Sequence, residues 1–259
     1  MEGFSGKVAV VTGAGSGIGR ALAVELARSG AKIAISDIDN EGLAETERQV
    51  KALGAEVRAD RLNVAEREAF LLYADAIKDH FGKVNQIYNN AGIAYQGEVE
   101  DGTKAFLPHL IASGDGHVVN VSSLFGVLSM PGQSAYNSAK FAVRGFTESL
   151  RQEMIIGKKP VAVTCVHPGG IKTAIARNST TAEGYDQQAM AAMFDKYLAN
   201  TSPEAAARII LTAVRKKKPR VLVGPDAKIL DVIVRLTGAR YQDIFSVVTR
   251  FILPRPGKK

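Results

Sequence analysis

The sequence predicts a doubly wound α/β fold, in which a parallel β-sheet of about seven strands has helices on both faces. Short runs rich in valine and isoleucine recur without polar alternation, as expected of parallel strands buried on both faces. Amphipathic helical patterns separate these runs, so that strand and helix alternate along a single domain that ends in a helical tail. The predicted strands are residues 7–13, 31–37, 55–63, 85–92, 117–123, 160–169 and 220–224.

The third of these strands differs from the others. Residues 55–63 alternate charged and apolar side chains, which suits a strand at the edge of the sheet. The helix before it places Leu43, Val50 and Leu53 along one face. The first helical segment, residues 20–30, ends on a glycine that can cap a helix.

Two further helices carry recognisable start signals. Asn63 and Glu66 occupy the N-cap and N3 positions of a predicted helix that ends on Gly82. Ser202 is the expected N-cap of the next, with Pro203 at its first position.

The composition is that of one globular domain. The chain has 259 residues, 46% apolar and 23% charged, which is enough for one large core. No apolar run reaches the roughly 18 residues that suggest a membrane span, and the N-terminus does not resemble a signal peptide. The single cysteine, Cys165, excludes an intrachain disulfide and fits a reducing cytoplasm, where we expect the protein. We interpret Cys165 as a small buried apolar residue.

A glycine-rich turn joins the first strand to the first helix. Gly13, Gly17 and Gly19 stand where the backbone of a dinucleotide site turns tightly, approaches a pyrophosphate and packs a helix on the sheet. Asp37 ends the second strand and can accept hydrogen bonds from both ribose hydroxyls, but would repel a 2′-phosphate. Ser16 brings no positive charge to such a phosphate, so the sequence predicts NAD rather than NADP.

Five segments in this order resemble the short-chain dehydrogenase/reductase family. They are TGAGSGIG at 12–19, Asp37, NNAG at 89–92, Ser123 with YNSAK at 136–140, and HPGGIKT at 167–173. The resemblance spans about two thirds of the chain and implies a Rossmann-type sheet with the strand order 3-2-1-4-5-6-7 and a single-domain oxidoreductase.

The resemblance also implies roles. Tyr136 would be the general acid/base, Lys140 would bind the nicotinamide ribose and lower the pKa of the tyrosine, and Ser123 would position the substrate oxygen. A free tyrosine has a pKa of ~10, and a nearby cation favours its phenolate. The implied cofactor contacts are Gly13, Ser16, Gly17, Ile18, Gly19, Asp37, Asn63, Val64, Asn90, Tyr136, Lys140, Gly169, Ile171 and Thr173.

One departure from the family concerns the segment after NNAG. Gly92 and Ser123 are 31 positions apart, which is shorter than the family pattern, and no residue matches the fourth catalytic residue, an asparagine. We do not give that role to Asn120, which lies on a predicted strand. Either the deletion is real or a segment is missing from the sequence. We expect one shortened helix centred on residues 102–112, with Pro108 near a kink or an end.

The net charge of +7 lies at the C-terminal end. Residues 215–259 contain twelve basic and three acidic residues, so residues 1–214 sum to −2, which argues against nucleic acid as a partner. We predict a dinucleotide-binding catalytic domain over residues 1–225 and a basic amphipathic extension of the same domain over residues 226–259. The four histidines have no metal-ligand spacing, and we interpret His167 as structural.

The extension contains two apolar helical stripes. Packing on the domain, on a sister subunit or over the substrate pocket is the favoured interpretation, and a basic amphipathic pair on a membrane surface is the alternative. The stripes are Ile229, Val232, Ile233 and Leu236, followed by Tyr241, Ile244, Phe245, Val248 and Ile252.

Together these features predict an NAD-dependent oxidoreductase, without a metal, that interconverts a hydrophobic secondary alcohol and its ketone. Residues 174–201 would supply part of the pocket wall, and steroids, terpenoids, acyl chains and small diols all stay open as substrates. A homodimer or homotetramer is expected. The alternative is an NAD-binding protein of the same fold without turnover, impaired by its shortened segment.

Overall fold

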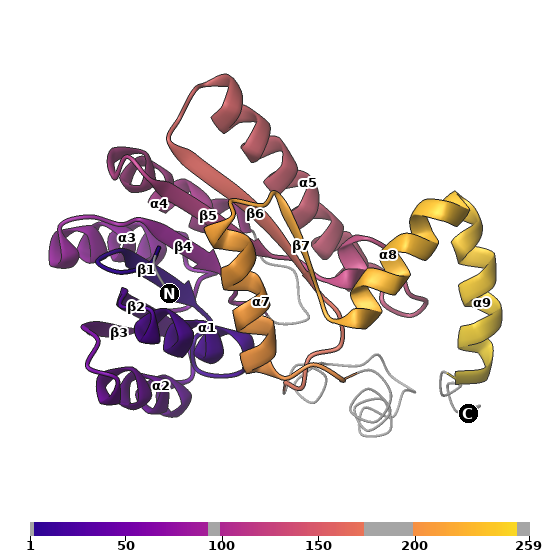
Figure 1. The fold of residues 1–259 in the computed structure, drawn as a ribbon, viewed down its shortest axis with the longest axis horizontal. Helices are drawn as coiled ribbons and strands as arrows, with labels where there is room; N and C mark the ends of the chain where they lie inside the picture. The colour runs from indigo at the N-terminus through magenta and orange to yellow at the C-terminus, as the bar shows by residue number, and fades with distance from the viewer. Residues whose placement is uncertain (1–2, 93–98, 174–198, 253–259) are drawn as a thin grey trace.

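The computed structural model describes residues 3–92, 99–173 and 199–252 (Figure 1). Seven parallel strands form one sheet in the order β3-β2-β1-β4-β5-β6-β7, which confirms the predicted topology and places the third strand at an edge. The strands are β1 (Val8–Thr12), β2 (Lys32–Asp37), β3 (Val57–Arg61), β4 (Gln86–Asn89), β5 (Gly116–Val121), β6 (Val161–Pro168) and β7 (Arg220–Val223).

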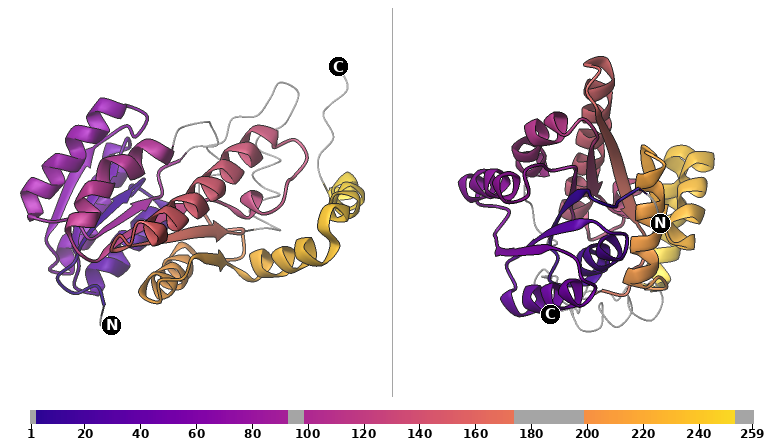
Figure 2. Two further views of the ribbon diagram at one scale, coloured as in Figure 1. Left: turned by 90° about the horizontal axis from the view of Figure 1, so that it is seen from above. Right: turned by 60° about the vertical axis from the view of Figure 1, so that its left-hand side comes forward.

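Helices cover both faces of the sheet (Figure 2). One face carries α1 (Gly17–Arg28), α2 (Asn40–Ala52) and α7 (Pro203–Arg215). The other carries α3 (Arg67–Phe81), α4 (Val99–Ala112) and α5 (Ser134–Ile156).

The central strands contribute side chains to the core on both faces of the sheet. Val11 and Ile33 pack on the side of α1, whereas Val10 and Ala34 pack on the side of α3. Successive residues of a strand point to opposite faces, and all four of these side chains are fully buried. This explains why the strands lack polar alternation.

In the part of the crossover that the structure describes, one helix, α4, precedes β5, which agrees with the prediction. It runs through Pro108, which has no N–H to donate to the preceding turn. Phe106 and Leu110 are fully buried beside it, and the Phe106 ring meets that of Phe70 edge to face at a centroid distance of 5.7 Å. The apolar face therefore holds the helix on the sheet despite the proline.

Two local predictions are wrong. Leu53 is 41% exposed because it follows the last turn of α2, beyond the stripe formed by Leu43 and Val50. Asn63 does not cap α3, which begins at Arg67. The Asn63 side chain instead accepts from the backbone N–H of Ala65 in a separate turn, because Asn readily closes such a turn by itself.

The chain after β7 forms a C-terminal arm, residues 225–252, made of α8 (Pro225–Thr237), η3 (Gly238–Arg240) and α9 (Tyr241–Ile252). The arm leads away from the sheet, and α9 lies at its far end (Figures 1 and 2). Its inner face packs on the loop after β5, where Ala227 and Tyr241 join Leu124 and Leu128 in a buried cluster. The Tyr241 hydroxyl also accepts from the Ser129 N–H at 3.0 Å.

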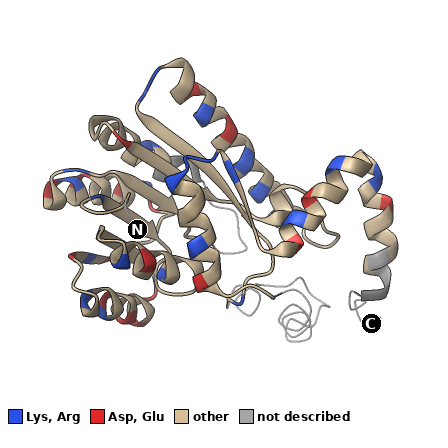
Figure 3. Ribbon diagram, in the orientation of Figure 1, with Lys and Arg blue, Asp and Glu red and all other residues tan. Residues whose placement is uncertain are grey.

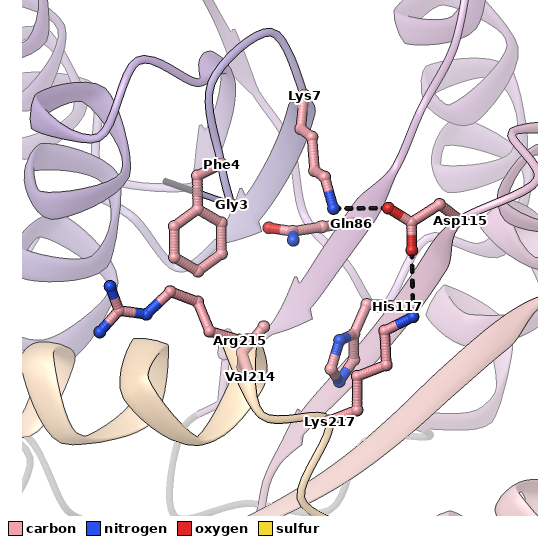
Figure 4. A pocket seen from close by; sticks show the side chains of 9 residues that line it. All are labelled: Gly3, Phe4, Lys7, Gln86, Asp115, His117, Val214, Arg215 and Lys217. Atoms are coloured by element: carbon pink, nitrogen blue, oxygen red, sulfur yellow. Dashed lines mark hydrogen bonds and ion pairs between the residues drawn. The ribbon is translucent and has the colours of Figure 1, made fainter. Parts of the chain in front are cut away.

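A cavity of about 140 Å³ lies at the N-terminal ends of the central strands (Figure 4). Within it, Lys7 Nζ contacts Asp115 Oδ2 at 2.5 Å and Lys217 Nζ contacts Asp115 Oδ1 at 3.3 Å. Burial lowers the pKa of His117 to about 4, so its ring is neutral near pH 7. We interpret these contacts as a clamp that joins the start of β1, the start of β5 and the turn after α7.

Among the described residues, no helix is long and apolar enough to cross a membrane. The same residues contain no group of three or more histidine, cysteine, aspartate or glutamate side chains that could hold a metal ion. Cys165 is buried on β6, as predicted, and is not disulfide-bonded.

We predict that Phe106→Ala lowers the free energy of unfolding by about 3–5 kcal/mol, because it leaves a cavity between α3, α4 and the sheet. Leu72→Ala is the control, since Leu72 is 71% exposed on α3, and we expect a change within about 0.5 kcal/mol. Urea unfolding measures both. Equal losses in the two variants would contradict the role of Phe106 in anchoring α4.

Candidate active site

The predicted site residues follow the carboxyl ends of the central strands. The glycine loop follows β1, Asp37 ends β2, Asn90 follows β4, Ser123 follows β5 and the HPGG turn ends β6. Because parallel strands end at the same edge of a sheet, the topology collects these segments at one side, where the strand order reverses.

The loop between β1 and α1 has no room for side chains at its first glycine. Gly13 has φ +65°, and a Cβ there would lie 2.7 Å from the Cα of Ala91. Asn90 holds the loop in place, since its Nδ2 donates to the carbonyls of Thr12 and Gly13, both at 3.1 Å. The structure therefore gives Asn90 a direct role in shaping the loop.

The start of α1 suits an anionic ligand. Ser16 is the N-cap residue, but its side chain makes no capping hydrogen bond. The backbone N–H groups in the first turn of α1 therefore have no side-chain acceptor from the cap and can face an anion. Gly17 has φ +54°, and a Cβ there would lie 3.1 Å from the Thr173 methyl group. The backbone cradle, open to a pyrophosphate and closed to side chains, thus fits a dinucleotide.

Asp37 lies directly beside this loop. Its Oδ2 accepts from the Gly15 N–H at 2.7 Å, and its Oδ1 accepts from the Asp39 N–H at 3.0 Å. The carboxylate is therefore held at the end of β2 by backbone donors. Asn63 and Val64 lie farther out, in the turn after β3, where Asn63 is exposed and Val64 is half-buried.

Ser123, Tyr136 and Lys140 come together after β5. Tyr136 and Lys140 lie one turn apart on α5, and Lys140 Nζ is 5.6 Å from the centre of the Tyr136 ring. Lys140 Nζ also donates to the Val121 carbonyl at 3.3 Å. The ring of Phe125 meets that of Tyr136 edge to face at 6.0 Å, so the tyrosine is fixed from two sides.

The two adjacent serines differ in their surroundings. The hydroxyl of Ser122 is buried and donates to the Lys140 carbonyl at 2.7 Å, which fastens α5 to the end of β5. Ser123 caps the short helix η1 (Leu124–Gly126) by accepting from the Phe125 N–H, and its side chain is also hydrogen-bonded to Tyr136. The structure thus brings Ser123, and not Ser122, to the tyrosine.

Burial shifts the pKa values of both Tyr136 and Lys140. It raises the pKa of Tyr136, and the hydrogen bond with Ser123 opposes that shift. The lowering of this pKa by Lys140 stays a prediction. Burial also lowers the pKa of Lys140 to about 8. Loss of water disfavours the phenolate and the ammonium alike.

A buried histidine supports the serine. His167 Nδ1 donates to the Ser123 carbonyl at 2.9 Å, a bond that ties the end of β6 to the loop after β5. Burial lowers the pKa of His167 to about 4, so the ring is neutral near pH 7. The structural interpretation of His167 therefore agrees with its position.

Sequence reasoning missed Asp226. Its Oδ2 accepts from the Gly170 N–H at 2.6 Å, and a side chain on Gly169 would collide with its carboxylate. It thereby joins the first turn of α8 to the HPGG turn that leads to Ile171 and Thr173. Gly-Pro-Asp at the start of a predicted helix was the available signal, but it points only to a helix N-terminus.

A polar network inside the core was missed as well. Asn120 Oδ1 accepts from Asn89 at 2.8 Å, and Asn120 Nδ2 donates to Thr147 at 3.0 Å. Asn89 also donates to Thr103 at 3.1 Å, so the network joins α4, β4, β5 and α5. Asn120 is fully buried in it. The predicted pocket wall, residues 174–201, lies almost entirely outside the described residues.

The profile of the short chain dehydrogenase family matches this chain in two pieces, residues 7–103 and 99–184. The pieces meet in the segment before β5 that the sequence identifies as short. A Mycobacterium tuberculosis protein described as "Putative oxidoreductase SadH" is 60% identical over 261 residues, which cover 93% of this chain and 95% of that protein. The alignment is longer than this chain of 259 residues, so the relative has residues at positions where this chain has none.

Two further proteins resemble the chain. Human estradiol 17-beta-dehydrogenase 11 is 34% identical over 203 residues, which cover 71% of this chain and 68% of the human protein. A crystal structure of a short chain dehydrogenase/reductase from Burkholderia phymatum in complex with NAD matches with a TM-score of 0.82 and 28% identity, and covers 100% of this chain and 99% of that one.

We predict that Asp226→Ala lowers the free energy of unfolding by about 1–3 kcal/mol, because the Gly170 N–H loses its acceptor. Asp226→Asn is the matched control, since its amide oxygen can still accept that bond, and it should retain most of the stability. Thermal and urea unfolding compare the variants. An alanine variant as stable as the wild type would show that this contact does not hold the turn.

Proposed function

The chain belongs to the short-chain dehydrogenase/reductase family, and we propose that it is an NAD-dependent oxidoreductase that interconverts a hydrophobic secondary alcohol and its ketone. The observation that carries the proposal is the grouping of Ser123, Tyr136 and Lys140 at the strand ends that also carry the glycine loop. A proton-transferring phenol, a cation beside it and a dinucleotide cradle are the parts that such a reaction needs.

Each of the three residues has a distinct task. Ser123 donates a hydrogen bond to the substrate oxygen and so orients it toward the Tyr136 hydroxyl. Tyr136 takes the hydroxyl proton when an alcohol is oxidised and returns it when a ketone is reduced. When bound, the nicotinamide supplies the second half of the chemistry, acceptance or donation of the hydride at the carbinol carbon. Lys140 holds the ribose and favours the phenolate.

The raised pKa of Tyr136 favours one direction near neutral pH. A protonated phenol is ready to act as an acid toward a ketone, whereas oxidation of an alcohol needs the phenolate. We therefore expect alcohol oxidation to speed up as the pH rises, with less change in ketone reduction below neutrality.

Asp37 supports NAD over NADP. Its carboxylate lies against the Gly15 N–H at the end of β2, where the adenosine ribose of a dinucleotide would sit. The negative charge of this carboxylate repels a 2′-phosphate, whereas its oxygens can accept hydrogen bonds from ribose hydroxyls. The other proposed cofactor contacts are Ser16, Ile18, Asn63, Val64, Asn90, Gly169, Ile171 and Thr173.

A relative and the lining of the site support the proposed substrate class. Human estradiol 17-beta-dehydrogenase 11, at 34% identity, is named for a hydrophobic secondary alcohol. The half-buried ring of Phe125 beside Tyr136 offers an apolar surface for such a substrate. We further propose a cytoplasmic homodimer or homotetramer, with the catalytic domain over residues 1–225 and its extension over residues 226–259.

A second candidate is an NAD-binding protein of the same fold without turnover. The division of the family match into two pieces that overlap at residues 99–103 favours it, because no residue of this segment matches the family's catalytic asparagine. Measuring NAD binding and alcohol-dependent NADH formation on one sample separates the two. A panel of secondary alcohols with NAD and NADP tests both the activity and the cofactor. Binding without NADH formation across that panel would favour the second candidate.

We predict that Tyr136→Phe reduces turnover by about 10²–10⁴-fold, because only the proton-transferring oxygen is removed. NAD binding should stay close to that of the wild type. Tyr73→Phe is the control, since Tyr73 is buried on α3, is not one of the proposed site residues and loses the same atom. Substantial alcohol oxidation by Tyr136→Phe would exclude the assignment.

For Lys140→Met we expect both a weaker affinity for NAD and slower turnover, because the ammonium serves the ribose and the phenol together. Calorimetry measures the first and initial rates the second. Lys83→Met, at an exposed position before β4, should change neither. Unchanged NAD affinity in Lys140→Met would argue against the ribose contact.

The cofactor preference is tested at one position by two variants. Asp37→Asn keeps an acceptor for the Gly15 N–H but removes the charge, so it should narrow the preference for NAD with little loss of stability. Asp37→Ala removes both and should also destabilise the loop. The readout is the ratio of kcat/KM for NAD and NADP. A wild type that already prefers NADP would refute our interpretation of Asp37.

A further inference from the structure

We propose that the C-terminal arm docks on an anionic membrane surface through its outer stripe, with the catalytic domain remaining in water. The outer stripe comprises the exposed aliphatic side chains of α8 and α9, which are Ile229, Val232, Leu236, Ile244 and Val247. This interaction is independent of the proposed reaction, because it is measured without turnover.

The inner face of the arm is already occupied by the domain. Ala227 is fully buried, and Leu230 and Val234, together with Leu222 of β7, pack against the cluster that contains it. Tyr241 anchors the start of α9 through its bond from the Ser129 N–H. Because these contacts fix the orientation of α8 and of the start of α9, the opposite faces cannot turn inward. Of the interpretations left open by the sequence, packing on the domain therefore accounts for one face only.

The outer stripe stays in contact with water in the single chain. Ile229, Val232 and Leu236 are 60%, 53% and 82% exposed, and their i, i+3, i+7 spacing puts them on one side of α8. On α9, Ile244 and Val247 are 46% and 60% exposed. Five of the twelve large apolar side chains exposed on the described residues thus belong to the arm. Contiguous apolar patches on soluble proteins usually mark interaction surfaces.

The charges around the stripe decide between lipid and a second copy of the chain. Lys228, Arg235 and Arg240 are exposed on α8 and η3. Figure 3 shows basic and acidic positions alternating along the arm. Arg235 is paired with the buried Asp231 at 2.7 Å, and Asp226 is bonded to the Gly170 N–H, which leaves Lys228 and Arg240 as exposed cations beside one exposed acid, Asp243.

The sequence from residue 244 to the end adds four basic residues and no acidic one. An apolar stripe among cations fits the interface of an anionic bilayer, where aliphatic side chains enter the acyl region and basic groups meet phosphates. The rest of the chain, residues 1–214, sums to only −2 and offers a second copy little electrostatic attraction.

Insertion of the stripe can be measured directly because the chain has no tryptophan. Val247→Trp places a single fluorophore on the outer stripe, and Leu72→Trp places one on the exposed face of α3 as the control. With vesicles of phosphatidylcholine and phosphatidylglycerol, we expect the emission of Val247→Trp to shift to shorter wavelength and that of Leu72→Trp to stay unchanged. Neither substitution removes an apolar side chain that the fold buries.

Loss of binding is measured by co-sedimentation with the same vesicles. Val232→Glu combined with Leu236→Glu should lower the partition coefficient at least about tenfold, because two aliphatic groups no longer leave water. Ile155→Glu combined with Ile156→Glu changes two similarly exposed residues at the end of α5 and should bind like the wild type. Binding should weaken at high salt and on vesicles of phosphatidylcholine alone. Matching melting curves show that the variants fold.

Three results would overturn the proposal. The wild type could stay in the supernatant with anionic vesicles, or the Val247→Trp emission could fail to shift. The third is a drop in molar mass by light scattering for the Val232→Glu and Leu236→Glu variant, without vesicle binding by the wild type. That result would assign the outer stripe to contacts between copies of the chain.

Discussion

The close approach of the β1–α1 loop to the end of β4 is the constraint on which the rest of the site depends. Gly13 must lack a side chain because the Ala91 backbone occupies that space, and Asn90 binds the loop from the same side. This contact sets where α1 begins, and hence where its amide-rich first turn faces. Asp37 and Thr173 then meet the loop at Gly15 and Gly17, so that segments far apart in the sequence form one cradle.

The proton-transferring half of the site is held by contacts to the backbone. Ser122 joins β5 to α5 through the Lys140 carbonyl, and His167 joins β6 to the Ser123 carbonyl. Tyr136 and Lys140 are half-buried between these segments, and the loss of water shifts the pKa of each toward its neutral form. The surroundings that fix these two side chains therefore also disfavour the phenolate and the ammonium, which are the charged forms that the reaction uses. The bound ligand then determines which protonation state prevails.

The C-terminal arm contributes to both halves. Asp226, in its first turn, holds the HPGG turn, and Tyr241 holds the loop that follows Ser123. The shortened segment before β5 is accommodated differently, by Phe106 and Leu110 in the core and by the network around Asn120. In the described residues, the apolar face of α4 is enough to cover the sheet beside β4 and β5.

The sequence by itself determined the place of the edge strand and the helix before β5, which follow from local patterns, namely charged and apolar alternation in the edge strand and an apolar helical face. Its resemblance to a known family implied the strand order and the set of segments that meet at the strand ends. Only the tertiary structure decided that Asn63 closes its own turn, that burial raises the pKa of Tyr136, and that Asp226 holds the HPGG turn. Each of these depends on which distant groups exclude water or supply a donor, and no local pattern encodes that. The sequence did not show which face of the C-terminal arm packs on the domain. The positions of Ala227 and Tyr241 in the structure identify that face.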